Sequence, residues 1–385
     1  MQQFLGCDAH KHYSVFVSVD ERGRASRPVR IEHNVAAYRR YLDTLPAGTE
    51  IAIESTGHWY WIVDLMERAG HRPHLANAFE AKKRMGKTHK TDALDAKGLA
   101  ILLRCGTLPE SWIPPGELRD QRELLRTRMA LRDLRTSLKH RIHSAIDRYG
   151  LHSTGISDIF GIKGRAYIAE TLPDLPPETA RMVALELECI DQLSVKLLPL
   201  EQHIDLTLRT SPEIQLLQTL PGVGKTLAPV LWLEIGDIER FARAESLASY
   251  AGLVPRVISS GGHTPHGGVC RNINRYLKWA FVEAANCAAH LRTQHEGHIG
   301  LLYQRLAPNK CHGRAIIAVA RHLAEASYWM LRKRESYRPP RIHNPSFKFG
   351  QARDTLRCGG PQGSALRSDN AQSARALDRR PRCGC

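Results

Sequence analysis

The sequence predicts an α/β unit at the N-terminus followed by a mainly helical remainder, and three observations indicate this. Over the first 110 residues, short apolar segments of strand type alternate with amphipathic segments of helix type. Residues 117–149 then contain neither Gly nor Pro, as one long helix requires. Further on, residues 183–208 carry apolar side chains at alternating spacings of four and three, which is typical of a helix that packs along another helix.

The N-terminal elements follow one another in an order that defines a fold. A helix capped by Asn34 and running to about residue 45 interrupts the strands, and further helices are expected at 58–69 and from about Asp92. The predicted strands are residues 3–8, 13–19, 27–33, 50–54 and 72–76, with a tight turn at 20–23. Three strands, helix, strand, helix, strand and helix is the order of an RNase H-like fold.

Four acidic residues stand at the ends of these elements. Asp8 ends the first strand, Glu54 ends the fourth, and Asp92 and Asp95 share one face at the start of a helix. If the two strands are neighbours, the four carboxylates form one cluster, whose hard oxygen ligands suit Mg²⁺ or Mn²⁺ and phosphoryl transfer. Each acid alone has the alternative interpretation of a helix cap or a surface residue, above all Asp92 after Thr91. His10 and His12, beside the first acid, are interpreted as surface residues.

The charge distribution indicates a polyanionic partner. The chain has 55 Lys and Arg against 39 Asp and Glu, a formal net charge of +16 over 385 residues. Basic side chains flank the Asp92 segment at Lys82, Lys83, Arg84, Lys87 and Lys90, where they can meet a phosphate backbone. The nine cysteines form no paired C-x-x-C framework, and no membrane-length apolar run is present, so we expect a reducing, cytoplasmic setting without membrane association.

Three segments resemble the acidic blocks of a known family, the DEDD-type insertion-sequence transposases. They are Phe4-Leu5-Gly6-Cys7-Asp8-Ala9-His10-Lys11, Ile53-Glu54-Ser55-Thr56-Gly57 and Lys90-Thr91-Asp92-Ala93-Leu94-Asp95-Ala96. The resemblance implies a RuvC-like N-terminal domain in which Asp8, Glu54, Asp92 and Asp95 are catalytic and bind the metal. It also implies a separate C-terminal domain that carries a serine.

The middle of the chain, residues 113–210, is expected to be a helical coiled-coil segment. The first long helix carries many basic side chains, which could contact nucleic acid or form a solvated coiled-coil face. The second, with Val183, Ile190, Leu197 and Ile204 at coiled-coil spacing, is either its antiparallel partner or an oligomer seam.

A glycine turn opens the next unit, residues 211–335. Leu220-Pro221-Gly222-Val223-Gly224-Lys225-Thr226 is not a P-loop, because that pattern needs Gly where Thr219 stands. The turn is interpreted as a helix-hairpin-helix, in which Gly222, Gly224 and Lys225 hold a DNA phosphate at the N-terminus of the following helix. The alternative is a purely structural turn between two helices.

A second glycine-rich stretch, Ser259-Ser260-Gly261-Gly262, lies among basic residues that could neutralise a phosphate: Arg256, Arg271, Arg275 and Lys278. A serine hydroxyl there could attack phosphorus and form a covalent intermediate. The stretch resembles the C-terminal domain of the same transposases, which implies that Ser260, or else Ser259, is the nucleophile. The resemblance further implies recombination of element ends and target double-stranded DNA through a phosphoserine, guided by an element-encoded bridge RNA, in a homo-oligomer.

The tail from residue 336 is expected to be disordered. Residues 341–385 hold eight Arg and one Lys against three Asp, a net charge of +6, and little that could form a core. The predicted domains are therefore 1–112, 113–210, 211–335 and 336–385. Three functions stay open: an RNA-guided serine transposase, a RuvC-like metal-dependent nuclease that cuts particular DNA structures without the serine, and a non-catalytic nucleic-acid-binding scaffold.

Overall fold

The computed structural model describes residues 3–86, 91–152, 155–208, 211–255, 273–290 and 297–339. Its contacts divide the chain into two compact units, Met1–Leu124 and Leu125–Cys385. The division into four domains drawn from the sequence stays a prediction. No helix in the described part is both long and apolar enough to cross a membrane.

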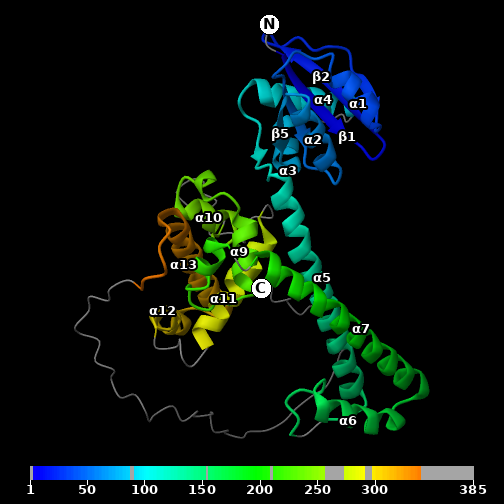
Figure 1. Ribbon diagram of the computed structural model, residues 1–385, viewed down its shortest axis with the longest axis vertical. Coiled ribbons are helices and arrows are strands. Elements are labelled where there is room, and N and C mark those ends of the chain that lie inside the picture. Colours follow the sequence, from blue (N-terminus) through cyan, green and yellow to red (C-terminus); the bar gives the residue numbers. More distant parts are fainter. Residues whose placement is uncertain are drawn as a thin grey trace, which may run out of the picture. The chain divides into compact units, whose positions relative to one another are not determined.

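The first unit is built on a mixed sheet, which confirms the predicted α/β class for this part of the chain (Figure 1). Its strands run in the order β3-β2-β1-β4-β5-β6, and β4 pairs in parallel with both β1 and β5. All five predicted strands are present, and the short strand at the edge was not predicted. The strands are β1 (Gln3–Ala9), β2 (Tyr13–Asp20), β3 (Val29–Glu32), β4 (Glu50–Glu54), β5 (Arg72–Ala76) and β6 (Glu110–Ser111).

Helices cover both faces of this sheet. The first begins after Asn34, whose side chain accepts hydrogen bonds from the N–H groups of Ala36 and Ala37, as predicted. On one face, α1 and α2 bury apolar side chains against Leu5, Cys7, Ile51 and Ile53 of the central strands. The other face, which includes Ala52, packs against α4. The helices are α1 (Val35–Leu42), α2 (Trp59–Arg68), α3 (Ala78–Met85), which was not predicted, and α4 (Asp92–Arg104).

A glycine on β1 lets α4 lie directly against the sheet. A Cβ atom added at Gly6 would lie 1.9 Å from the carbonyl oxygen of Ala96 and 2.8 Å from the backbone nitrogen of Ala100. Both are backbone atoms of α4 and cannot rotate away as a side chain can. The absence of a side chain at Gly6 therefore sets how closely this helix, with Asp92 and Asp95 at its start, approaches the strand that carries Asp8.

We expect Gly6→Ala to destabilise the protein by about 3 kcal/mol or more, because overpacking a core with one methyl group costs about 1–3 kcal/mol even where side chains can adjust. Urea unfolding followed by circular dichroism measures the change. Gly57→Ala is the matched control, since a Cβ there meets no atom within 4 Å. Equal stabilities of the two variants would contradict the close approach as the reason for glycine at position 6.

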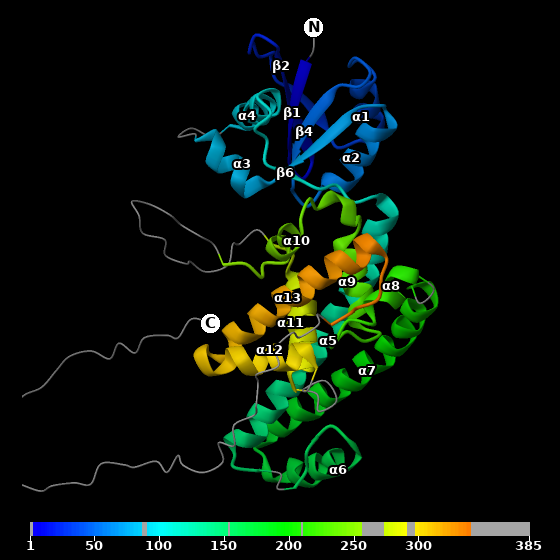
Figure 2. The same ribbon diagram turned by 90° about the vertical axis from the view of Figure 1, so that its left-hand side faces the viewer.

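The second unit is helical and begins within a long helix, α5, which pairs with α7. Three cross-helix contacts fix the pairing: Arg128 with Glu201, Arg135 with Ser194 and Arg141 with Glu186. The partner's number falls as the α5 residue number rises, so the helices are antiparallel, which agrees with the first of the two predicted alternatives (Figures 1 and 2). The helices of this unit are α5 (Gly116–Arg148), α6 (Ile162–Thr171), α7 (Pro177–Leu208), α8 (Pro212–Leu217), α9 (Leu227–Ile235), α10 (Ala244–Tyr250), α11 (Arg275–His290), α12 (His298–Leu306) and α13 (His312–Lys333).

Small side chains line the contact between two central helices of the second unit, α11 and α13. Helix α11 buries Ala280, Ala284 and Ala288, and α13 buries Ala320 and Ala324. Alanine on both sides lets helix backbones approach closely. Helix α9 is buried almost along its whole length, from Leu227 to Ile235, because α8 and α11 pack against it.

Candidate functional site

The parallel pairing of β1 and β4 brings two of the predicted acids to the same edge of the sheet. Cys7 pairs with Ile53, so Asp8 and Glu54 stand at the next position of each strand. Because side chains alternate along a strand, Asp8 and Glu54 face away from the core that holds Cys7 and Ile53, toward the face covered by α4. The Asp8 side chain is buried there, and that of Glu54 is half-buried.

Helix α4 places the other two acids at this edge. Thr91 is its N-cap, and the Thr91 side chain accepts a hydrogen bond of 3.2 Å from the N–H of Leu94. Asp92 is thus the first helical residue and not the cap, so the capping alternative does not apply to it. Asp92 and Asp95 lie three residues apart on one face, and both are half-buried.

Two further side chains complete the geometry around Asp8 and Asp92. The Nε2 atom of His10 lies 3.2 Å from Oδ2 of Asp8 and 3.3 Å from Oδ1 of Asp92. Tyr13 donates a hydrogen bond of 3.0 Å from its hydroxyl to Oδ2 of Asp92. The Arg30 guanidinium lies over the Tyr13 ring, 3.7 Å from its centroid. The imidazole therefore connects an acid of the sheet with an acid of the helix.

The electrostatics of this cluster favour a bound cation. Burial raises the pKa of Asp8 above its ordinary value, and the charges of Asp95 and Asp92 raise it further, while His10 opposes the shift. The carboxylates thus repel one another in a partly dehydrated place. A cation between the carboxylates attracts each of them and so offsets their mutual repulsion.

The donor set fits a divalent metal ion. One donor atom each from Asp8, His10 and Asp92 lies within 4.8 Å of the others, the one such group found among the residues that the structure describes. Two of its three donors are carboxylate oxygens, which Mg²⁺ and Mn²⁺ prefer. The charge of Asp95 raises the pKa of Asp8, and Glu54 lies at the end of the neighbouring strand β4. The residues present therefore match the chemistry of the predicted metal site.

Sequence reasoning missed His10 and Tyr13 as members of this site, and interpreted His10 as a surface residue. His10 lies just after the end of β1, in the turn to β2, so the strand period did not fix its direction and the contact with Asp92 needed the fold to be found. His12, by contrast, is exposed, as predicted. The contact of Tyr13 with Asp92 joins residues 79 positions apart and needed the fold to be found.

In the helical unit, the predicted phosphate-binding turn connects α8 and α9. Gly222 has a positive φ of 79°, and a Cβ atom there would lie 2.0 Å from the carbonyl oxygen of Ala284 on α11. Glycine at this position is therefore explained by packing and by backbone conformation. Gly224 and Lys225 are exposed, and a Cβ atom at Gly224 would meet nothing within 4 Å. These two residues are free to approach a ligand.

A buried polar network joins the two helix ends that bracket the serine-bearing segment. The backbone N–H of Asn274 donates to the carbonyl oxygen of Tyr250 at 2.9 Å, and the Asn274 amide donates to Glu234 at 2.8 Å. Glu234 is 2% exposed and accepts two hydrogen bonds from Arg126, at 2.9 and 3.0 Å. Sequence reasoning did not single out these residues. Arg275, which was predicted to bind nucleic acid, follows Asn274 and is exposed at the start of α11.

Six predicted site residues lie outside the described part of the chain. They are Lys87, Lys90, Arg256, Ser259, Ser260 and Arg271. The tail from residue 340 onward also lies outside it.

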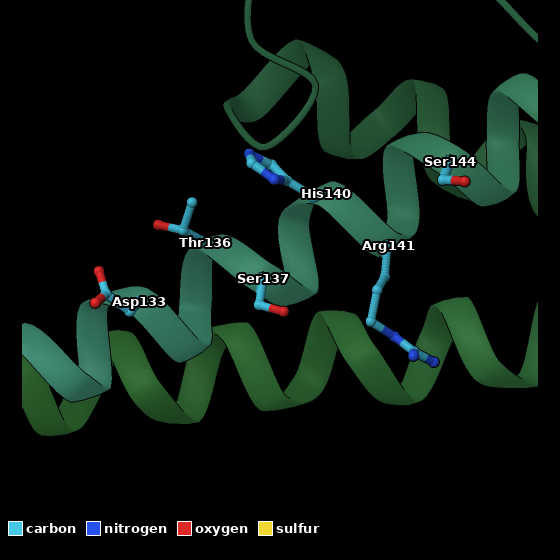
Figure 3. A pocket seen from close by; sticks show the side chains of 6 residues that line it. All are labelled: Asp133, Thr136, Ser137, His140, Arg141 and Ser144. Atoms are coloured by element: carbon cyan, nitrogen blue, oxygen red, sulfur yellow. The ribbon is translucent and has the colours of Figure 1, made fainter. Parts of the chain in front are cut away.

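Many arginines of α5 serve internal contacts. Arg119 pairs with Asp64 and Arg122 stacks on Trp112, both within the first unit, whereas Arg128, Arg135 and Arg141 contact α7. Farther along, a shallow polar pocket of about 500 Å³ lies on this helix, with Arg141 directed toward α7 (Figure 3). It is lined by Asp133, Thr136, Ser137, His140, Arg141 and Ser144. Of the predicted roles for the basic side chains of α5, contact with nucleic acid and a solvated coiled-coil face both stay predictions.

Two family models match this chain. One is described as a transposase, is named for the DEDD transposases of the IS110 group, and matches residues 5–151. The other is described as the transposase IS116/IS110/IS902 family and matches residues 214–298. The first match contains Asp8, Glu54, Asp92 and Asp95, and the second contains the turn at Gly222 and the serine-bearing segment.

Curated relatives agree with these matches. The chain is 25% identical over 340 residues to the transposase for insertion sequence element IS1111A of Coxiella burnetii, covering 87% of this chain and 91% of that protein. A probable family 20 transposase of Pseudomonas aeruginosa is 25% identical over 296 residues, covering 75% and 86%. The pilin gene-inverting protein of Moraxella bovis is 47% identical over 60 residues, or 16% and 19% of the two chains. This chain therefore belongs to the DEDD-type insertion-sequence transposases, and it is a DNA transposase.

Proposed function

We propose that this transposase cuts and rejoins the DNA of a mobile insertion sequence with two chemical groups, a metal-binding acidic tetrad and a serine nucleophile. The tetrad is Asp8, Glu54, Asp92 and Asp95, and the nucleophile is Ser260. The observation that carries the proposal is the joining of Asp8 to Asp92 through His10, at the strand edge where Glu54 also ends. Such a cluster weakens the binding of a polyanion unless a cation occupies it.

The N-terminal unit is proposed to be a RuvC-like domain of the RNase H class. The proposal is supported by three antiparallel strands followed by two parallel ones, in the order β3-β2-β1-β4-β5, with acids at the ends of β1 and β4. DEDD transposases use divalent metal ions, and Mg²⁺ or Mn²⁺ is the ion we propose. When bound, such ions activate the attacking oxygen and stabilise the leaving oxygen of phosphoryl transfer.

The protein side chains have separate tasks in this scheme. Asp8 and Glu54, held by the sheet, and Asp92 and Asp95, held by α4, would hold the divalent ions that act on a DNA phosphate. The Ser260 hydroxyl attacks phosphorus, the bond from phosphorus to the leaving DNA oxygen breaks, and that oxygen takes up a proton. The resulting phosphoserine ester conserves the bond energy, so that a second DNA hydroxyl can displace the serine and rejoin the strands.

Nucleic-acid contacts are assigned to exposed basic groups. Gly224 and Lys225 are proposed to contact DNA phosphates in the turn before α9, which we propose is a helix-hairpin-helix; Arg275, at the start of α11, is proposed to do so beside the serine-bearing segment. Gly222 supports that turn by packing on α11. Lys87, Lys90, Arg256 and Arg271 are assigned the same role from the sequence. A bridge RNA encoded by the element and a dimeric or tetrameric assembly complete the proposal, through the family resemblance.

Removing divalent metal tests the proposal. Protein treated with EDTA is expected to lose DNA cleavage and strand joining on labelled element-end DNA, because the repelling carboxylates then have no counter-ion. Adding back Mg²⁺ or Mn²⁺ restores both, whereas added NaCl of equal ionic strength does not. A denaturing gel of the DNA products measures the result. Undiminished cleavage in EDTA would contradict a metal-dependent tetrad.

A further inference from the structure

The position of the His10 imidazole matches that of a metal ligand. Its Nε2 atom lies 3.2 Å from an oxygen of Asp8 and 3.3 Å from an oxygen of Asp92. Adjacent ligands around an octahedral ion with bonds of about 2.1 Å lie about 3 Å apart. The two distances from His10 thus have nearly the spacing of adjacent ligands on such an ion, and the three donor atoms all lie within 4.8 Å of one another. The same distances fit a hydrogen bond or ion pair between the imidazole and the two acids, so the test of the proposal must detect nitrogen bound to the metal itself.

The fold holds this ring in place. The backbone N–H of His10 donates to the backbone carbonyl oxygen of Tyr13 at 2.9 Å, and this hydrogen bond closes the tight turn between β1 and β2. The rings of the two residues are 4.9 Å apart, and the Tyr13 hydroxyl binds the other oxygen of Asp92. Tyr13 therefore positions both His10 and Asp92. A pre-formed donor set loses less conformational entropy when it binds an ion.

We propose that His10 is a nitrogen ligand of the divalent cation, and that it makes the site select Mn²⁺ over Mg²⁺. This inference rests on the proposed metal site and adds to it a ligand outside the acidic tetrad. Mg²⁺ binds oxygen ligands and keeps much of its water, whereas transition-metal ions accept imidazole readily. Nitrogen in place of one oxygen therefore favours manganese.

Pulsed electron paramagnetic resonance of the full chain loaded with Mn²⁺ tests the proposal directly. The wild type is expected to show electron spin echo modulation from ¹⁴N bound to manganese. His10→Ala loses that modulation, and the matched control His12→Ala, which removes an exposed histidine two residues away, retains it. Wild-type protein labelled with ¹⁵N-histidine shows the ¹⁵N pattern instead, which identifies histidine without any substitution.

Metal affinities give a second readout. His10→Ala should weaken Mn²⁺ binding at least about tenfold, because mutation of a residue that only hydrogen-bonds to a metal ligand already lowers metal affinity by about that factor. The same substitution should weaken Mg²⁺ binding much less. If the wild type binds Mn²⁺ without nitrogen modulation, and the Asp8→Asn variant does not bind Mn²⁺, the nitrogen ligand is wrong and the acidic metal site remains supported. Failure of the wild type to bind Mn²⁺ at all would overturn both.

Discussion

Asp8→Asn is expected to lower strand cleavage and transposition at least about a thousandfold, because a metal ion held for phosphoryl transfer supplies several kcal/mol of transition-state stabilisation. Asp8 is the buried member of the cluster and the one that joins the sheet to His10. An amide has one weak oxygen donor and no charge, so it cannot replace the carboxylate as a ligand. Excision of a marked element from a plasmid, counted by colonies, measures the loss.

The same substitution should leave the fold intact, which separates loss of chemistry from loss of structure. The pKa of Asp8 is raised by burial and by its acidic neighbours, so the folded protein disfavours the ionised side chain. A group whose folded pKa lies above its unfolded value lowers stability once the pH exceeds the unfolded pKa, and a neutral Asn removes that cost. The melting temperature without metal should therefore be unchanged or higher.

Asp43→Asn is the matched control for Asp8→Asn. Asp43 is an exposed aspartate of the same unit and stands at the end of α1, on the other face of the sheet. It should keep full activity. Near-normal excision by Asp8→Asn would contradict the acidic tetrad as the source of catalysis.

Ser260→Ala is expected to abolish the covalent joining of protein to DNA. The hydroxyl is the proposed nucleophile, and a methyl group cannot form a phosphate ester. Purified protein is incubated with its RNA, labelled junction DNA and Mg²⁺, and the products are run on a denaturing gel. The wild type should give a slow-migrating, protease-sensitive adduct, and Ser260→Ala should give none.

Ser259→Ala is the internal control, since it removes the neighbouring hydroxyl and should keep the adduct. An adduct lost in Ser259→Ala and kept in Ser260→Ala would assign the nucleophile to Ser259. If the wild type and both variants cut DNA to free ends without any adduct, the serine chemistry is wrong. The protein would then be a nuclease that uses its acids and water.

The hydrogen-bond network of Glu234 and Asn274 joins the two helix ends on either side of the serine-bearing segment. Asn274 ties the start of α11 to the end of α10 by backbone and side-chain hydrogen bonds, and its amide is in turn held by a buried carboxylate. Glu234 is itself neutralised by Arg126, so the network brings no uncompensated charge into the core. Both flanks of residues 256–272 are therefore anchored to each other.

Local patterns in the sequence predicted much of the first unit. Strands β4 and β5 were predicted with their observed ends, and for β4 the reason is that a short apolar run, Ile51 to Ile53, has few other solutions. The Asn34 cap was predicted from its own chemistry. Helix α3 and strand β6 were missed. The first is short and half charged, and the second has two residues and exists only by pairing with β5.

The sequence by itself determined which residues are candidates for the chemistry: the four acids, the serine and the basic turns are local motifs, and each can be recognised from its neighbours in the chain. Only the tertiary structure decided how they meet. Sequence reasoning assigned no special role to Gly6, and its importance follows from the packing of α4 against it. Most arginines of the long helix were candidate nucleic-acid contacts, and in the structure they contact α7, Asp64 and Trp112. His10 and Tyr13 joined the site only through Asp92. The physical reason is that a motif depends on spacing along the chain, whereas contacts between distant residues depend on register and helix packing.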